Sequence, residues 1–200
     1  YNMYNFNSPD LLYVHSDASK FFYSKYFKWP SKKVKKIASL RISKKKSSEF
    51  KDKIFLPYDF YNVDEITRNF ESFIIFYKRK KIKPFKVNIH PARKNSKKHL
   101  MLKKKMNEVI KNYTSNFSKK SGTSFSIHIG NTSTVVEALE ANVIVTHIVT
   151  DPIFDLFSSK FWPSIKVENL SNNAFKYSIK KFCKCLIFKN KTSNFKKNHK

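Results

Sequence analysis

A chain of 200 residues with 41 basic and 14 acidic side chains has a formal net charge of +27, which excludes a neutral, non-interacting surface. With 40% hydrophobic and 16% aromatic residues, it can bury the core of one domain, or of one domain plus part of another. Two cysteines, Cys183 and Cys185, are too few for a disulfide scaffold and fit a reducing compartment.

The amino-terminal quarter predicts a small set of elements that belong to a different part of the protein. The chain begins with Tyr1 rather than Met, so we expect a trimmed or partial product. We expect residues 1–50 to be the remnant or end of an amino-terminal lobe plus a linker. The apolar runs 11–15 and 34–40 predict strands, and the aromatic run 18–27 predicts a helix. The Ser/Lys-rich stretch 41–53 is typical of a linker.

From residue 51 to 187 the chain predicts a regular alternation of strands and helices. The strands are short apolar runs: 53–57, 85–89, 124–129 and 143–149. The helices have apolar residues at helical spacing or begin at capping residues: 62–80, 97–112, 132–141 and 171–187. This order is typical of an α/β fold with a Rossmann-like parallel sheet and helices on both faces. The lysine- and asparagine-rich stretch 188–200 is expected to be a basic tail.

Ligands of such folds bind outside the carboxyl ends of the strands. The loop after the third of these strands combines a glycine, hydroxyl side chains and a helix start, an arrangement that favours a phosphate. Its candidate residues are Gly130, Asn131, Thr132, Ser133, Thr134 and, one turn into the helix, Glu137. A second interpretation stays open, because Thr134 and Glu137 also have the spacing of an ordinary capping box.

The loop after the second strand places His90 at the end of a buried strand, and Pro91 fixes the turn behind it. A histidine there can donate to a phosphate oxygen or act as an acid or base, and Arg93 adds positive charge. The other interpretation is a polar strand end bonded to nearby backbone. We take His90 as the catalytic candidate and Arg93 as a substrate-binding one.

Weaker candidates lie elsewhere on the predicted edge. Asp59, after the first strand, either contacts a sugar or begins a turn, and Asp151 and Asp155 after the fourth strand are equally ambiguous. Cys183 and Cys185 lack a second pair at zinc spacing and are expected in the core. The sequence predicts neither a metal nor a resident cofactor.

These motifs resemble the carboxyl-terminal, donor-binding lobe of GT-B glycosyltransferases that build bacterial surface carbohydrate, including capsule, O-antigen and sialyltransferase-like enzymes. The resemblance covers roughly residues 50–187. It is carried by four short segments: His90-Pro91, the run from Asn131 to Leu139, Asp151-Pro152-x-x-Asp155 and Trp162-Pro163.

The resemblance implies that His90 donates to the phosphate of a CMP- or CDP-type donor and that Ser133 and Thr134 hold the same phosphate. Glu137 would lie near the ribose. In that family the catalytic base belongs to the amino-terminal lobe, for which residues 1–50 contain no convincing equivalent.

We therefore expect a glycosyltransferase-type protein of surface polysaccharide biosynthesis. It would bind a CMP- or other NDP-linked sugar and transfer the sugar to a carbohydrate or lipid-linked acceptor. The expected location is cytoplasmic, with peripheral contact to the anionic inner face of the membrane as a further partner. Alternatives are a GT-B-fold epimerase, a phosphoglycerol transferase, or a basic protein that binds nucleic acid or anionic membrane without catalysis.

The charge itself has two interpretations. It indicates a polyanionic partner, or it reflects AT-rich codons, which favour Lys, Asn, Phe, Ile and Tyr. Nucleic acid is the less favoured partner, because the lysines are spread over the whole chain and no nucleic-acid-binding motif is present.

Overall fold

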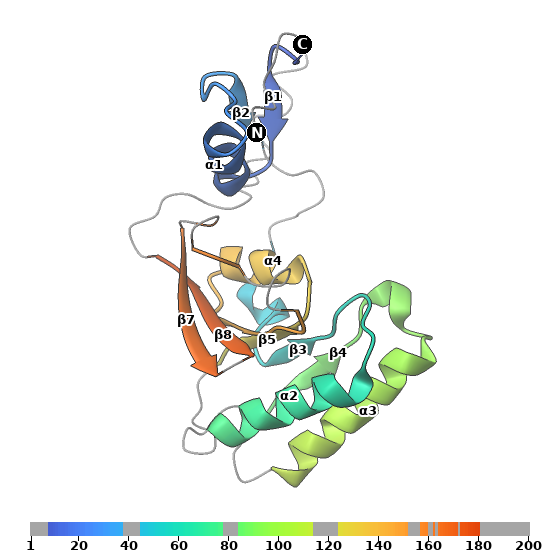
Figure 1. The fold of residues 1–200 in the computed structure, drawn as a ribbon. Helices are drawn as coiled ribbons and strands as arrows, with labels where there is room; N and C mark the ends of the chain where they lie inside the picture. The colour runs from blue at the N-terminus through green and yellow to red at the C-terminus, as the bar shows by residue number, and fades with distance from the viewer. Residues whose placement is uncertain are drawn as a thin grey trace. The chain divides into compact units, whose positions relative to one another are not determined.

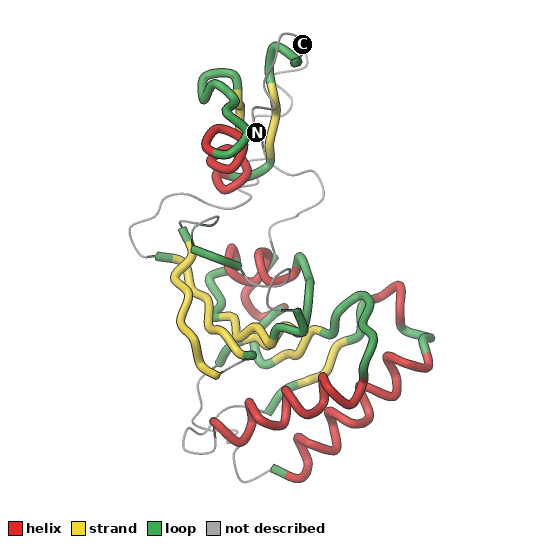
Figure 2. Tube along the Cα trace, viewed as in Figure 1, coloured by secondary structure: helices red, strands yellow, loops and turns green. Residues whose placement is uncertain are grey.

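The structure is a computed structural model that describes residues 8–37, 45–77, 84–113, 124–151, 157–159, 162, 164–171 and 173–180. Figure 2 shows these residues in colour, as helices, strands and loops. They belong to two compact units. The first holds the described residues up to Lys45, those among Phe157–Lys166 and those from Ile179 onward, and the second holds those in Lys46–Leu156 and Val167–Ser178. The second unit covers most of the described residues of the predicted lobe 51–187.

The first unit contains a short strand–helix–strand motif. Its elements are β1 (Leu12–Val14), α1 (Asp17–Lys25) and β2 (Val34–Lys36), and the two strands pair in parallel. Ser16 begins the helix, because its side chain accepts a hydrogen bond from the Ser19 backbone N–H at 2.9 Å. The buried side chains of Val14, Trp29 and Val34 form its core.

The second unit is built on a mostly parallel sheet, as the alternation predicts (Figure 1). Across the described strands the order is β4-β3-β5-β6-β8-β7, with β4, β3, β5 and β6 parallel and β8 antiparallel to β6. The strands are β3 (Lys53–Phe55), β4 (Lys86–Asn88), β5 (Ser126–Ile129), β6 (Val145–Ile148), β7 (Ile165–Ser171) and β8 (Ala174–Ile179). The helices are η1 (Ser47–Glu49), α2 (Val63–Phe76), η3 (Pro91–Arg93), α3 (Lys97–Asn112) and α4 (Thr134–Glu140).

Helices cover both faces of this sheet. The strand register aligns Ile54, Val87 and Ile127, and these side chains pack with the apolar faces of α2 and α3 in one buried cluster. Their neighbours Phe55 and His128 point to the opposite face, because side chains alternate along a strand. There Phe55 stacks on His128, which in turn reaches α4. In Figure 1, α4 lies on the other side of the strands from α2 and α3.

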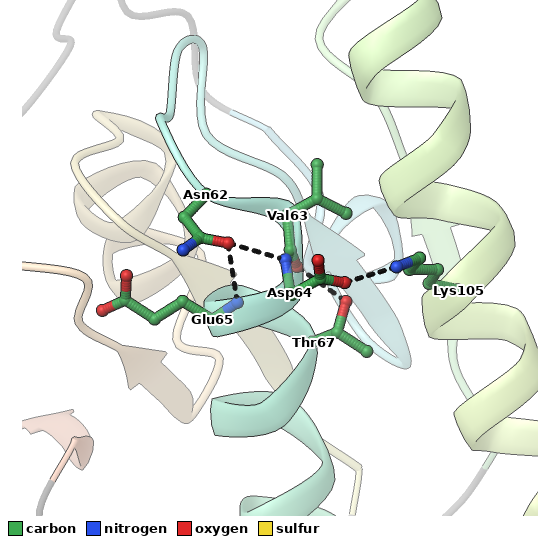
Figure 3. A network of polar contacts seen from close by, with 6 residues as sticks. All are labelled: Asn62, Val63, Asp64, Glu65, Thr67 and Lys105. Atoms are coloured by element: carbon green, nitrogen blue, oxygen red, sulfur yellow. Dashed lines mark hydrogen bonds and ion pairs between the residues drawn. The ribbon is translucent and has the colours of Figure 1, made fainter.

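The start of α2 is fixed by local polar contacts (Figure 3). The Asn62 side chain accepts hydrogen bonds from the backbone N–H groups of Asp64 and Glu65, at 3.0 and 3.1 Å, as the predicted cap requires. Asp64 also forms an ion pair with Lys105 of α3. The bond to Lys105 and its positive charge lower the pKa of the Asp64 carboxyl. This contact ties the two helices together at the surface.

One predicted element is wrong. In place of the helix expected at 171–187, the described residues form the end of β7 and the strand β8, which pair with each other. Residues 172 and 181–187 lie outside the described part. The last of the parallel strands is β6 (Val145–Ile148). Its outer edge faces no further parallel strand, and β8 pairs with that edge over all of β6. Since Ala174 and Tyr177 are buried in this pairing, tertiary contact overrides the helical spacing.

The core makes a direct stability prediction. Phe70 of α2 is 0% exposed, whereas Phe76 at the end of the same helix is 55% exposed. We expect Phe70→Ala to lower the free energy of unfolding by about 3–5 kcal/mol, because it removes buried apolar surface and leaves a cavity. Phe76→Ala is the matched control and should cost under about 1 kcal/mol. Urea denaturation of both variants checks this, and equal losses would contradict the assigned core.

Candidate functional site at the carboxyl edge of the sheet

The loops after β3, β4 and β5 leave the parallel strands at the same edge. From β3 the chain goes to β4 on one side and then returns to β5 on the other. The strand order therefore reverses at β3, and ligands of open α/β sheets bind at such reversals. The central loop, Pro57 to Tyr61, lies between the two loops that contain the predicted site residues.

On the β4 side, Tyr58 holds two of the predicted residues together. The guanidinium of Arg93 lies over the Tyr58 ring at 4.1 Å from its centroid, and its Nε donates to the Tyr58 carbonyl at 3.1 Å. The His90 ring packs edge-on against the same tyrosine, with centroids 5.1 Å apart. His90 itself is exposed and begins η3.

The contact of His90 with the backbone shows which ring nitrogen carries the proton when the imidazole is neutral. Its Nδ1 accepts a hydrogen bond from the Ala92 backbone N–H at 3.2 Å. A neutral imidazole has one donor and one acceptor, so the proton is on Nε2. The donor of the exposed His90 is therefore Nε2–H, and both His90 and Arg93 pack on Tyr58.

The loop after β3 is anchored by the first turn of α3. Lys98 donates to the Phe60 carbonyl and lies over the rings of Phe60 and Tyr61, while His99 Nε2 contacts the Pro57 carbonyl at 3.1 Å. Asp59 is exposed, and its carboxylate accepts from the Phe60 backbone N–H at 2.9 Å. This bond is local to the loop after β3.

On the β5 side, Gly130 occupies a position that a side chain would not fit. Its φ is +60°, and an added Cβ would lie 3.0 Å from Thr150 Oγ1 and 3.3 Å from Pro57 Cβ. Both the left-handed backbone and the close approach to Pro57 require glycine. The predicted glycine therefore serves to pack the β5 loop against the β3 loop.

The capping box considered for α4 is not formed. The residue that begins the helix is Ser133, which makes no side-chain capping bond. The Thr134 hydroxyl is bonded instead to Thr132 Oγ1 and to His128 Nδ1, each at 2.9 Å. These two threonines therefore brace the loop internally.

The remaining predicted residues divide by exposure. Asn131 and Ser133 are exposed, and Glu137 is half-buried in the first turn of α4. Because β3 separates β4 from β5, the loops that contain His90 and Ser133 start roughly 10 Å apart, two strand spacings. Both loops flank Pro57, so a ligand contacting His90 and Ser133 would extend across the end of β3.

Two buried histidines under this edge were missed by the sequence analysis. His128 and His147 are 0% exposed and are direct partners in the β5–β6 register. His128 is bonded to Thr134 and, through Nε2, to Ser126 Oγ at 3.0 Å. His147 Nε2 donates to the Gly130 carbonyl at 2.8 Å, and its Nδ1 is 3.2 Å from the Tyr177 hydroxyl. The sequence did contain a signal for these two residues, because each is a histidine within an apolar run, one or two residues before the end of the predicted strand.

Several of the predicted site residues lie outside the described part of the chain. Asp151 is described, whereas Pro152, Asp155, Cys183 and Cys185 are not. Among the residues that the structure describes, no three His, Cys, Asp or Glu side chains are grouped as metal ligands would be. The same residues include no helix long and apolar enough to cross a membrane.

Comparison with protein-family models, curated proteins and solved structures finds no match to this chain. The functional assignment therefore depends on the residues and geometry of the edge alone.

The buried histidines predict a dependence of stability on acid. Burial first, and the neighbouring His147 second, lower the pKa of His128 well below the usual histidine value. The unfolded chain binds a proton near pH 6.5 and the folded chain does not, so stability is full above about pH 6.5 and falls below it. The expected slope from His128 is up to about 1.4 kcal/mol per pH unit.

Urea denaturation across a pH series measures this slope, and His128→Gln should flatten it. His15→Gln, at an exposed histidine, is the matched control and should leave the slope unchanged. An imidazole NMR titration of the wild-type protein provides a test without substitution. A His128 ring that gains a proton near pH 6.5 in the folded state would contradict the prediction.

Proposed function

We propose that the second unit is the Rossmann-like donor-binding lobe of a GT-B-type glycosyltransferase that acts in surface carbohydrate synthesis. The nucleotide of a nucleotide-sugar would bind at the carboxyl edge of the sheet. The parallel strands and the reversal of their order at β3 support this location.

The observation that carries the proposal is the group of Tyr58, His90 and Arg93. His90 offers its Nε2–H, and Arg93 offers the guanidinium nitrogens that Tyr58 does not engage. Stacking on Tyr58 orders the Arg93 side chain before any ligand arrives, so less conformational entropy is lost on binding. A guanidinium and an imidazole N–H that both pack on one tyrosine are groups suited to the oxygens of a phosphate.

The exposed residues of the β5 loop complete the proposed site. Asn131 and Ser133 are exposed residues of the β5 loop, whose Gly130 packs against Pro57, and the rest of a nucleotide would extend toward them beyond its phosphate. Gly130 contributes its close backbone approach, and Thr132 and Thr134 keep the loop in place. Glu137 is assigned to the ribose, and Asp59 to the turn that presents Tyr58.

In this mechanism the bond between the sugar and the nucleotide phosphate breaks, and the phosphate leaves with the bonding electron pair. His90 and Arg93 stabilise the negative charge that develops on the leaving oxygen. The acceptor hydroxyl forms the new bond to the sugar and loses its proton to a base outside this edge. The residues of the second unit thus act on the leaving group.

Calorimetric titration with CMP, CDP, UDP and GDP at moderate salt tests the proposal. We expect one nucleotide to bind more tightly than the others. His90→Ala should weaken it about tenfold, or ~1.4 kcal/mol, as expected for a hydrogen bond to a charged group. His15→Ala, an exposed histidine of the first unit, is the control and should leave binding unchanged.

One outcome of the titration would contradict the proposal. Weak and similar binding of all four nucleotides, lost with salt and unaffected by His90→Ala, would mean that the lysines attract phosphate without a site. The glycosyltransferase proposal would then fail for this chain.

A further inference from the structure

The outward side of α3 is a basic surface with two apolar residues at its amino-terminal end. We call it the α3 outer face. Its members are Lys97, Leu100, Met101, Lys103, Lys104, Asn107, Glu108 and Lys111. Leu100 is 48% and Met101 49% exposed, so both side chains keep substantial contact with solvent. Four lysines against one glutamate make this face strongly positive.

The packing of α3 fixes the direction of this face. The opposite side of the helix is buried through His99, Leu102, Met106 and Val109. Lys105, on the flank, is paired with Asp64 of α2. The lysines of the outer face are therefore turned away from the sheet, and their positive charge faces the surroundings.

The face also contains a shallow hollow. Its volume is about 440 Å³, and all of its lining residues come from α3. Leu100 and the methylene chains of the lysines contribute apolar surface, and its lining includes three lysines, Lys103, Lys104 and Lys111, with one glutamate, Glu108. Exposed lysines next to apolar surface have the composition that suits the boundary between phospholipid headgroups and acyl chains.

We propose that the α3 outer face docks on a bilayer surface that contains anionic phospholipid. The lysines would contact lipid phosphates, while Leu100 and Met101 would enter the boundary below the headgroups. Each lysine near an anionic bilayer surface contributes about fivefold, or about 1 kcal/mol, to binding, and exposed apolar side chains add to it by leaving water. This proposal does not require nucleotide binding at the sheet edge.

The residue types favour a bilayer over nucleic acid. A single-stranded nucleic acid would use exposed aromatic rings for stacking, and the α3 outer face contains none. Leu100 and Met101 add nothing to phosphate binding, whereas they gain free energy by leaving water for a lipid boundary. The exposed apolar pair among lysines therefore points to lipid.

The α3 outer face begins close to the proposed donor site along the chain. Lys97 is the first residue of α3 and follows η3, whose cap is His90, by a short turn. A docked α3 would bring the proposed donor site close to the bilayer, where a lipid-linked acceptor would be held. This link alone depends on the proposed function.

Sedimentation with vesicles tests the docking. Vesicles of phosphatidylcholine alone are compared with vesicles of phosphatidylcholine and phosphatidylglycerol in equal parts. The combined variant Lys97→Gln/Lys104→Gln/Lys111→Gln should weaken binding to the anionic vesicles on the order of 100-fold, about fivefold for each lysine. The matched control is Lys32→Gln/Lys35→Gln/Lys51→Gln, which removes the same charge from exposed lysines elsewhere and should have a far smaller effect.

A second variant separates apolar insertion from attraction by charge alone. Leu100→Ser/Met101→Ser should reduce the binding that persists at high salt, while leaving the charge unchanged. Equal losses for the two lysine variants would show that net charge, not this face, binds the membrane and would overturn the proposal. So would unchanged vesicle binding of the Ser variant, or a competing RNA that displaces all vesicles.

Discussion

Two imidazoles buried side by side in the centre of the sheet constrain the whole candidate site. His128 and His147 are paired in register, and each forms hydrogen bonds through both ring nitrogens. A buried imidazole without partners would be costly, so its bonds must be made by whatever lies nearby. In this protein the partners are Ser126 of β5, Gly130 and Thr134 beyond the end of β5, and Tyr177 of strand β8.

The site geometry follows from that constraint. The His147 bond holds the Gly130 carbonyl, and Gly130 in turn packs against Pro57 with a left-handed backbone. The loops after β5 and β3 are thereby fixed to each other at the sheet edge. Tyr58, next along the β3 loop, then orders Arg93 and contacts His90. Because the donors at this edge are already ordered, less conformational entropy is lost when an anion binds.

Local patterns predicted the parallel core well, and failed where the choice depended on distant residues. The bounds of α3 were predicted correctly, yet Leu100, Met101 and Leu102 are all apolar, and only their packing shows that Leu102 is the buried one. Residues 171–187 have a spacing that suits a helix, but Ala174–Ile179 form a strand that pairs with the outer edge of β6. Likewise, the hydroxyls of Thr132 and Thr134 were predicted as ligand donors, since the buried His128 that engages Thr134 cannot be paired with it from sequence alone.

The central claim is that a nucleotide binds at the edge formed by the loops after β3, β4 and β5. Amide chemical-shift mapping of isotope-labelled protein, titrated with each of CMP, CDP, UDP and GDP, tests it most directly. The account predicts that the largest changes fall on Tyr58, His90, Arg93 and the Gly130–Ser133 loop. Changes confined to the lysines of the α3 outer face, with the sheet edge unaffected, would contradict it.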